Sequence, residues 1–248
     1  MAKLVAMNNP YNTNLDRNPA NFQPLTPLTF LERAASVYPN HTAIVHGKLR
    51  RNYSDFYSRS RQLASALSEQ GIARGDTVSV ILSNTPAMLE AHYGVPMCGA
   101  VLHSINTRLD PDTIAYQLDH ANSKALIVDR EFLKTAKTSL ELAGVSPILI
   151  EFNDSEYPIK ESLPGAIEYE EFLLKGDKNY NWLMPEDEWD AISLNYTSGT
   201  TGNPKGVVSH HRGAYLLAQG NAMIASIKKH SVYLWTLPMF HCNGWCFP

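Results

Sequence analysis

The residues best suited to chemistry lie in one glycine-rich run near the end of the chain. This run comprises Tyr196, Thr197, Ser198, Gly199, Thr200, Thr201, Gly202, Asn203, Pro204, Lys205 and Gly206. Its glycines leave backbone N–H groups unshielded, its three threonines and one serine add hydroxyl donors, and Lys205 adds a positive charge. Successive N–H groups beside a lysine form a concavity that binds anions. The composition therefore predicts a loop that binds a polyphosphate, placed between two strands at the edge of a sheet.

Two familiar phosphate-binding motifs do not fit this run. The P-loop places its lysine between a glycine and a serine or threonine, whereas Lys205 follows Pro204 and precedes Gly206. The dinucleotide fingerprint G-x-G-x-x-G does not occur, so a P-loop NTPase and a dinucleotide-binding enzyme are both disfavoured. A glycine-rich hairpin without a ligand is the structural alternative, but the hydroxyl residues packed among the glycines argue against it.

The run Tyr196–Gly206 resembles the signature loop of the adenylate-forming superfamily, which includes acyl-CoA synthetases, plant coumarate–CoA ligases, luciferases and peptide-synthetase adenylation domains. Every position matches, and Asn203 occupies the variable one. The resemblance implies an ATP site in which Lys205 neutralises phosphate charge and takes part in catalysis. It also implies that the β- and γ-phosphates are held by Thr197, Ser198, Gly199, Thr200, Thr201, Gly202 and Lys205.

A second candidate cluster lies near the end of the chain, around His241, Cys242 and Cys246. A zinc site would need a further pair of ligands, a haem attachment site needs the order Cys-x-x-Cys-His, and a redox pair normally has two intervening residues. A structural alternative is a buried aromatic turn in which the cysteines act as small hydrophobes. The run Pro238–His241, followed by Asn243 and Gly244, resembles the second core motif of acyl-activating enzymes, which implies a catalytic His241 beside the carboxylate and the α-phosphate.

Earlier segments, Asn106–Arg108 and Pro24–Pro27, also resemble family segments, so the likeness extends over nearly the whole chain. It implies an acid–thiol ligase that uses ATP, Mg²⁺ and coenzyme A to convert a carboxylic acid into acyl-AMP and then acyl-CoA. A short or medium fatty acid is the expected substrate, and an aromatic acid is the second choice.

The likeness covers the first half of a typical member. The segments for adenine, ribose and magnesium, and the small C-terminal domain, find no match. We therefore expect residues 1–248 to be the N-terminal part of an AMP-binding adenylation domain that is inactive alone. The alternative is a non-catalytic, truncated nucleotide-binding module or pseudoenzyme.

Composition limits the other partners. Apolar residues make up 44% of the 248 residues, charged residues 18%, and the net charge is −3, so nothing favours nucleic acid as a partner. No metal-ligand cluster, signal peptide or membrane-spanning run is predicted, and three cysteines suggest a reducing compartment. We expect a cytoplasmic location, or a peroxisomal one where a C-terminal signal follows residue 248. The oligomeric state is not predicted.

Alternating helical and strand patterns indicate how these residues are positioned. From residue 77 to residue 150 a strand and a helix alternate, which predicts an α/β fold with a parallel-rich sheet flanked by helices, the truncated N-terminal part of the family's large domain. Residues 1–24 are expected to form an extended arm and residues 152–189 a surface connection. The expected strands are 42–46, 49–53, 77–82, 100–103, 125–129, 147–150, 191–196, 207–208 and 231–237. The expected helices are 28–37, 54–69, 85–98, 110–120, 131–143, 169–174 and 211–226.

Overall fold

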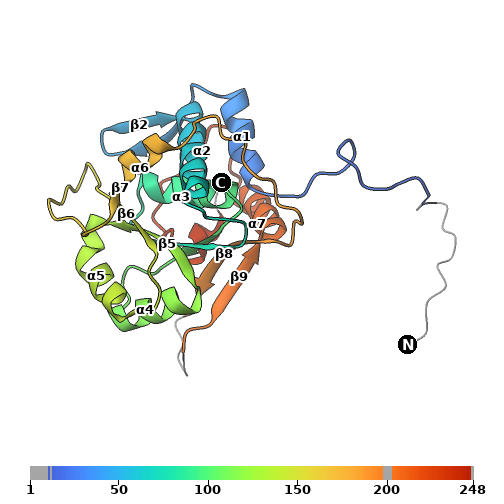
Figure 1. Ribbon diagram of the computed structural model, residues 1–248. Coiled ribbons are helices and arrows are strands. Elements are labelled where there is room, and N and C mark those ends of the chain that lie inside the picture. Colours follow the sequence, from blue (N-terminus) through green and yellow to red (C-terminus); the bar gives the residue numbers. More distant parts are fainter. Residues whose placement is uncertain (1–10, 12, 198–202, 247–248) are drawn as a thin grey trace, which may run out of the picture.

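A mainly parallel sheet lies between two layers of helices in the computed structural model, which describes residue 11, residues 13–197 and residues 203–246 (Figure 1). In this part of the chain the sheet has seven strands in the order β7-β6-β5-β3-β4-β8-β9. Neighbours are parallel except for β8 and β9, which are antiparallel. The strands are β3 (Thr77–Ile81), β4 (Val101–Ser104), β5 (Ser123–Asp129), β6 (Ile148–Phe152), β7 (Ile167–Glu168), β8 (Ala191–Tyr196) and β9 (Gly206–His210). The predicted α/β fold class is confirmed.

The remaining elements surround this sheet. A separate antiparallel hairpin consists of β1 (Thr42–His46) and β2 (Leu49–Asn52), as the sequence predicted. The helices are α1 (Leu28–Val37), α2 (Tyr53–Glu69), α3 (Pro86–Met97), α4 (Pro111–His120), α5 (Leu133–Leu142), α6 (Tyr169–Lys175) and α7 (His211–Ile224).

Local capping explains where two of these helices begin. The carboxylate of Asp110 accepts a hydrogen bond from the backbone N–H of Thr113 at 2.9 Å, so α4 starts with Pro111 in its first turn, as predicted. The side chain of Asn52 accepts from the N–H of Asp55 at 2.8 Å, and α2 therefore starts one residue before the predicted Ser54.

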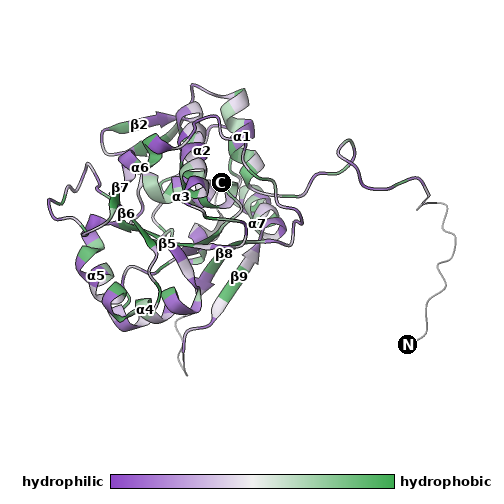
Figure 2. Cartoon of the chain, viewed as in Figure 1, coloured by the Kyte–Doolittle hydropathy of each residue, from purple (hydrophilic) through white to green (hydrophobic). Residues whose placement is uncertain are grey.

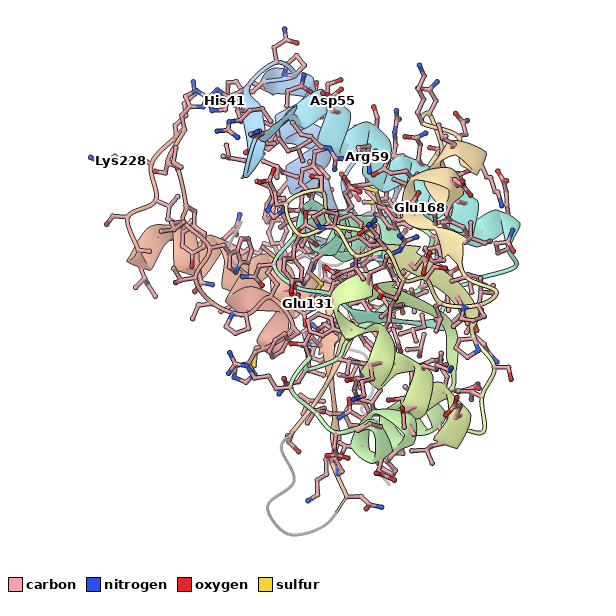
Figure 3. All side chains as sticks on the ribbon, turned by 90° about the vertical axis from the view of Figure 1, so that its left-hand side faces the viewer. His41, Asp55, Arg59, Glu131, Glu168 and Lys228 are labelled. Atoms are coloured by element: carbon pink, nitrogen blue, oxygen red, sulfur yellow. The ribbon has the colours of Figure 1, made fainter. Side chains whose placement is uncertain are left out.

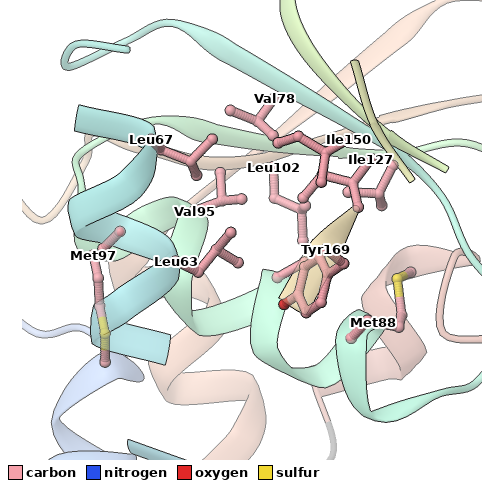
Figure 4. Close-up of a cluster of buried hydrophobic side chains, with 14 of the residues drawn as sticks. Leu63, Leu67, Val78, Met88, Val95, Met97, Leu102, Ile127, Ile150 and Tyr169 are labelled. Atoms are coloured by element: carbon pink, nitrogen blue, oxygen red, sulfur yellow. The ribbon is translucent and has the colours of Figure 1, made fainter. Parts of the chain in front are cut away.

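Two hydrophobic clusters, one on each face of the sheet, hold the layers together. The first joins α1, α2, α3 and α6 to the sheet (Figure 4), and the second joins α4 and α5 to it. The buried run of β5 alternates between them: Ala125 and Ile127 face the first cluster, and Leu126 and Val128 face the second. Figure 2 shows β5 and β6 coloured as hydrophobic, whereas α4 and α5 carry both polar and apolar residues. This is the pattern of central strands buried on both faces.

The predicted strand at 231–237 is wrong. These residues form no helix or strand, and Val232 and Leu234 are 94% and 82% exposed. A strand needs a neighbour for its backbone groups, and none of the described strands lies beside this segment. The side-chain amide of Asn84 instead donates to the carbonyls of Leu237, at 2.8 Å, and Trp235, at 3.4 Å.

The segment 152–189 is more than a surface connection. It contributes β7, which pairs in parallel with β6 and was not predicted. It also contributes α6, whose side chains of Tyr169, Phe172 and Leu173 are buried in the first cluster. At the other end of the chain, residues 13–24 form no helix or strand.

A buried carboxylate connects four elements on the first face. Glu90 of α3 is fully buried and forms ion pairs with Arg51 of β2 and, at 2.7 Å, Arg59 of α2. The hydroxyl of Tyr169 in α6 donates to the same carboxylate at 2.9 Å. Arg59 also forms an ion pair with the half-exposed Glu170 at 2.6 Å. Figure 3 labels Arg59 and Glu168 on this side of the molecule. Because each charge has partners, the network is compatible with burial.

A second buried carboxylate makes stability depend on pH. Burial raises the pKa of Asp129 to about 6, with a smaller raising effect from the charges of Glu131 and Asp154. The folded state therefore holds a proton that the unfolded state releases near pH 4, so this group favours folding at low pH. Its contribution is lost as the pH rises through 6.

Asp129→Asn should therefore stabilise the fold at pH 8 by about 1–3 kcal/mol and leave it unchanged at pH 4. Asparagine keeps the oxygen that accepts the N–H of Glu131. Thermal unfolding of both proteins at the two pH values measures the difference. An equal gain at both values would contradict the assignment.

Candidate functional site

The carboxyl ends of β3, β4 and β8 meet at one edge of the sheet, because these strands are parallel neighbours. The strand order places β4 on one side of β3 and β5 on the other, so the chain reverses its direction across the sheet at β3 and β4. Open α/β sheets bind ligands in the crevice at such a reversal. A crevice of about 200 Å³ lies here, lined by Ser83, Asn84, Thr107, Arg108, Thr236, Pro238 and Phe240.

The glycine-rich run leaves the sheet at the same edge, as predicted. Tyr196 at the end of β8 pairs with Gly206 at the start of β9. One step further, the N–H of Thr197 donates to the carbonyl of Lys205 at 3.0 Å. The N–H of Lys205 donates to the hydroxyl oxygen of Thr197 at 3.3 Å. These two hydrogen bonds close the base of the loop and hold Thr197 and Lys205 face to face.

The predicted phosphate ligands divide into two groups. Thr197 and Lys205 are both exposed at the base of the loop, and Lys205 has no acidic partner within ion-pair distance among the described residues. The other predicted ligands lie outside the described residues, so their role stays a prediction. They are Ser198, Gly199, Thr200, Thr201 and Gly202.

Three polar side chains at the ends of three strands hold the turn that carries His241. Asn84 accepts the N–H of Met239 at 2.9 Å while it donates to the carbonyl of Leu237. Asn195 of β8 donates to the carbonyl of Phe240 at 3.3 Å and to the hydroxyl of Ser104 at 2.9 Å. The hydroxyl of Ser104 lies 3.3 Å from the side-chain oxygen of Asn243 and from the carbonyl of Phe240. The side chain of Met239 is buried in the first cluster, so the turn also packs against the core.

His241 itself is exposed, and its Nδ1 lies 3.9 Å from the sulfur of Cys242. The next three residues have left-handed backbones, with φ of 48° at Cys242, 51° at Asn243 and 62° at Gly244. Such a run is costly for residues other than glycine, and the hydrogen bonds of Asn243 and Phe240 support it. Cys242 is exposed, which contradicts the alternative that this cysteine acts as a small hydrophobe in a buried turn.

The site therefore brings together the two segments that the sequence singled out. Asn195 contacts the His241 turn and stands two residues before Thr197, which places that turn beside the base of the loop. Thr107 and Arg108 line the crevice, and the side chain of Asn106 accepts the N–H of Arg108 at 2.9 Å. Sequence reasoning missed Asn84, Ser104 and Asn195. Asn84 follows β3, whereas Ser104 and Asn195 lie within β4 and β8, and no local pattern singled them out.

Asn84→Ala should loosen the His241 turn without unfolding the sheet. Removing the side-chain hydrogen bonds to Met239, Leu237 and Trp235 lowers the local opening free energy by about 1–2 kcal/mol, so the Met239 amide should exchange with solvent roughly ten-fold faster. Asn84→Asp is the matched control, because it keeps the acceptor for Met239 and removes the donor for Leu237. Protection at Met239 should survive in that control. Unchanged exchange in Asn84→Ala would contradict the role.

Metal binding finds no support in the described side chains. Residues 11, 13–197 and 203–246 contain no group of three His, Cys, Asp or Glu residues placed to hold a metal ion. In the same ranges, no helix is long and apolar enough to cross a bilayer.

Comparisons with known proteins agree with the geometry. An acetate/butyrate–CoA ligase of Arabidopsis thaliana, named as peroxisomal, is 52% identical over an alignment of 247 residues that covers 95% of this chain and 43% of that protein. An acetate–CoA ligase of Humulus lupulus is 47% identical over an alignment of 248 residues that covers 94% of this chain and 43% of that protein. The chain thus spans less than half the length of these relatives.

A solved structure of a long-chain-fatty-acid–CoA ligase from Archaeoglobus fulgidus shares the fold, with a TM-score of 0.76 and 22% identity. The match covers 91% of this chain and 45% of that one. The family model for AMP-binding enzymes matches residues 31–248, which is most of the sequence. The chain therefore belongs to the AMP-binding enzymes, the adenylate-forming family that its glycine-rich run resembles.

Proposed function

We propose that this chain forms the phosphate-binding part of an acid–thiol ligase that activates a carboxylic acid with ATP and passes the acyl group to coenzyme A. One observation carries the proposal: the base of the loop, with Thr197 and Lys205 exposed, is held beside the His241 turn at the carboxyl edge of the sheet. The first step joins a carboxylate oxygen to the α-phosphorus of ATP and releases pyrophosphate. The second joins the thiol sulfur to the acyl carbon and releases AMP.

Lys205 and Thr197 suit the first step. Negative charge grows on the leaving pyrophosphate, and a preorganised cation stabilises this charge most where water is excluded. Lys205 provides a compact ammonium on a flexible stem. The hydroxyl of Thr197 accepts the N–H of Lys205, so its own proton remains available for a phosphate oxygen.

His241 is proposed to orient the carboxylate or to close its site. Its turn is fixed to β3, β4 and β8 through Asn84, Ser104 and Asn195. Attachment to three strand ends is suited to positioning, because groups held by strands are placed more precisely than groups held by loops. Mg²⁺ accompanies ATP in such reactions, but the described side chains contain no group of three His, Cys, Asp or Glu residues placed to hold a metal ion, and we derive no step through the metal.

A short aliphatic acid, acetate to butyrate, is the substrate that we propose. Both relatives described above carry such acids in their names, and an aromatic acid is the next choice. The protein is proposed to act in the cytoplasm or in peroxisomes, and one of these relatives is named as peroxisomal. A fluorescent fusion imaged beside a peroxisomal marker would separate the two locations.

Acid-dependent exchange of labelled pyrophosphate into ATP tests the function. Residues 1–248 are joined to the remaining C-terminal part of the Arabidopsis thaliana relative, and the chimera is compared with residues 1–248 alone. We expect exchange with acetate and butyrate in the chimera and none in the chain alone. Exchange with benzoate only would change the substrate class. A folded chimera without exchange on any acid would favour the non-catalytic module.

A further inference from the structure

Helix α4 contacts both ends of the glycine-rich loop through two side chains, Tyr116 and His120. They stand four residues apart and so share one face of the helix, where their rings stack with centroids 5.5 Å apart. The hydroxyl of Tyr116 donates to the carbonyl of Pro204 at 3.4 Å. Nδ1 of His120 lies 2.7 Å from the hydroxyl of Tyr196. His120 therefore reaches the end of β8 before the loop, and Tyr116 reaches Pro204, two residues before β9 begins.

Tyr196 is fixed from its other side as well. Its ring lies 5.1 Å from the ring of His103, which is fully buried in β4. Burial lowers the pKa of His103 to about 4, so this ring is neutral, and the hydroxyl of Ser79 lies 2.8 Å from its Nδ1. Burial, with a smaller effect from Tyr116, raises the pKa of Tyr196 to about 12. The phenol thus keeps its proton, and its oxygen lies within hydrogen-bond distance of Nδ1 of His120.

These contacts act at an edge of the described sheet, where a strand is held by backbone hydrogen bonds on one side. In the described sheet, β9 is an edge strand with β8 as its neighbour, and edge strands open more readily than central ones. Pro204 has no N–H and cannot donate a backbone hydrogen bond to the neighbouring strand. Its carbonyl is therefore the backbone group through which another element can hold the chain at this position. Tyr116 supplies that contact one residue before Lys205.

We propose that Tyr116 and His120 are positioning residues that clamp the two ends of the loop and so preorganise Thr197 and Lys205 for a polyphosphate. The binding consequence rests on the proposed function. A loop whose ends are already fixed loses less freedom when its ligand binds, which increases affinity without adding a contact. Tyr116 and His120 contact Pro204 and Tyr196, and they act on Thr197 and Lys205 through the backbone.

Two readouts on residues 1–248 test the clamp. The first is hydrogen exchange at the amides of Thr197 and Lys205. These amides should exchange about 5–20-fold faster in His120→Ala, as expected when one hydrogen bond and the packing of the His120 ring are lost. The second is calorimetric binding of pyrophosphate with Mg²⁺, for which Kd should rise by a similar factor, about 5–20-fold.

Matched variants separate a positioning role from general damage. His120→Asn offers an oxygen close to the place of Nδ1 and should restore most of the protection and affinity. Tyr116→Phe should weaken both about 3–10-fold, since it removes one hydroxyl donor. Tyr215→Phe is its control, because that hydroxyl accepts from Gln219 on α7 and has no hydrogen bond to Thr197 or to residues 203–206 of the loop. The amide of Val78 in the core should be unaffected throughout.

Unchanged exchange at Thr197 in His120→Ala would overturn the clamp. Faster exchange with an unchanged Kd would overturn its role in binding. A wild-type chain that binds no pyrophosphate would contradict the proposed function, and the exchange rates would still decide whether the clamp exists.

Discussion

Lys205→Ala should slow adenylate formation by about 10²–10³-fold, the loss typical when one preorganised electrostatic group is removed from a transition state. The carboxylic acid does not depend on this cation for its own binding, so its KM should change much less than kcat. Acid-dependent pyrophosphate exchange in the chimera measures the effect. This change has the largest expected effect on function, because the exposed Lys205 faces Thr197 across the base of the loop.

Two controls sharpen the result. Lys228→Ala removes an equally exposed lysine from the segment after α7 and should leave the exchange rate unchanged. Lys205→Arg keeps the charge but spreads it over a planar group, so it should recover part of the rate. If Lys205→Ala exchanged pyrophosphate at the wild-type rate, its assigned role would be wrong.

Glu90→Ala should have the largest effect on stability, a loss of about 3–5 kcal/mol. The change removes the buried partner of Arg51 and Arg59 and leaves two partly buried cations and the hydroxyl of Tyr169 without it. For a chain of this length the loss corresponds to a melting temperature lower by roughly 10 °C. Thermal unfolding followed by circular dichroism measures it.

Glu170→Ala is the matched control for the buried carboxylate. Glu170 also pairs with Arg59, but its side chain is 49% exposed, so its removal should cost at most about 1 kcal/mol. Equal losses for the two variants would show that burial does not set the strength of the network. Glu90→Leu combined with Arg51→Met and Arg59→Met should recover much of the loss, because the whole network is then replaced by apolar side chains.

The sequence predicted the structural features that depend on residues close to one another in the chain. The alternation of apolar strands and helices from residue 77 to residue 150 indicated the parallel sheet, because burial on both faces leaves continuous apolar runs. The composition of the glycine-rich run indicated a loop between two strands, and β8 and β9 flank it. By contrast, β7 has two residues, Ile167 and Glu168, which is too short for a periodic pattern.

The misses depend on residues that are distant in the sequence. Residues 231–237 have the composition of a strand, but strand formation also requires a free edge beside them. Asn84 contacts Met239 across 155 residues, and Asn195 contacts Ser104 across 91. No local pattern reports such partners. The clamp of α4 on the loop was missed for the same reason, although Tyr196 and Lys205 were both singled out.

The position of β4 in the sheet has a consequence for the synthesis of the chain. β4 pairs with β3, which precedes it, but its other edge pairs with β8, and Ser193 follows its partner Leu102 by 91 residues. At about 5–20 residues per second, a ribosome needs roughly 5–20 s to complete that interval. During this time the apolar strands β3, β4 and β5 can associate while one edge of β4 stays unpaired. A nascent chain with such an edge is a natural client for a chaperone that binds extended apolar segments.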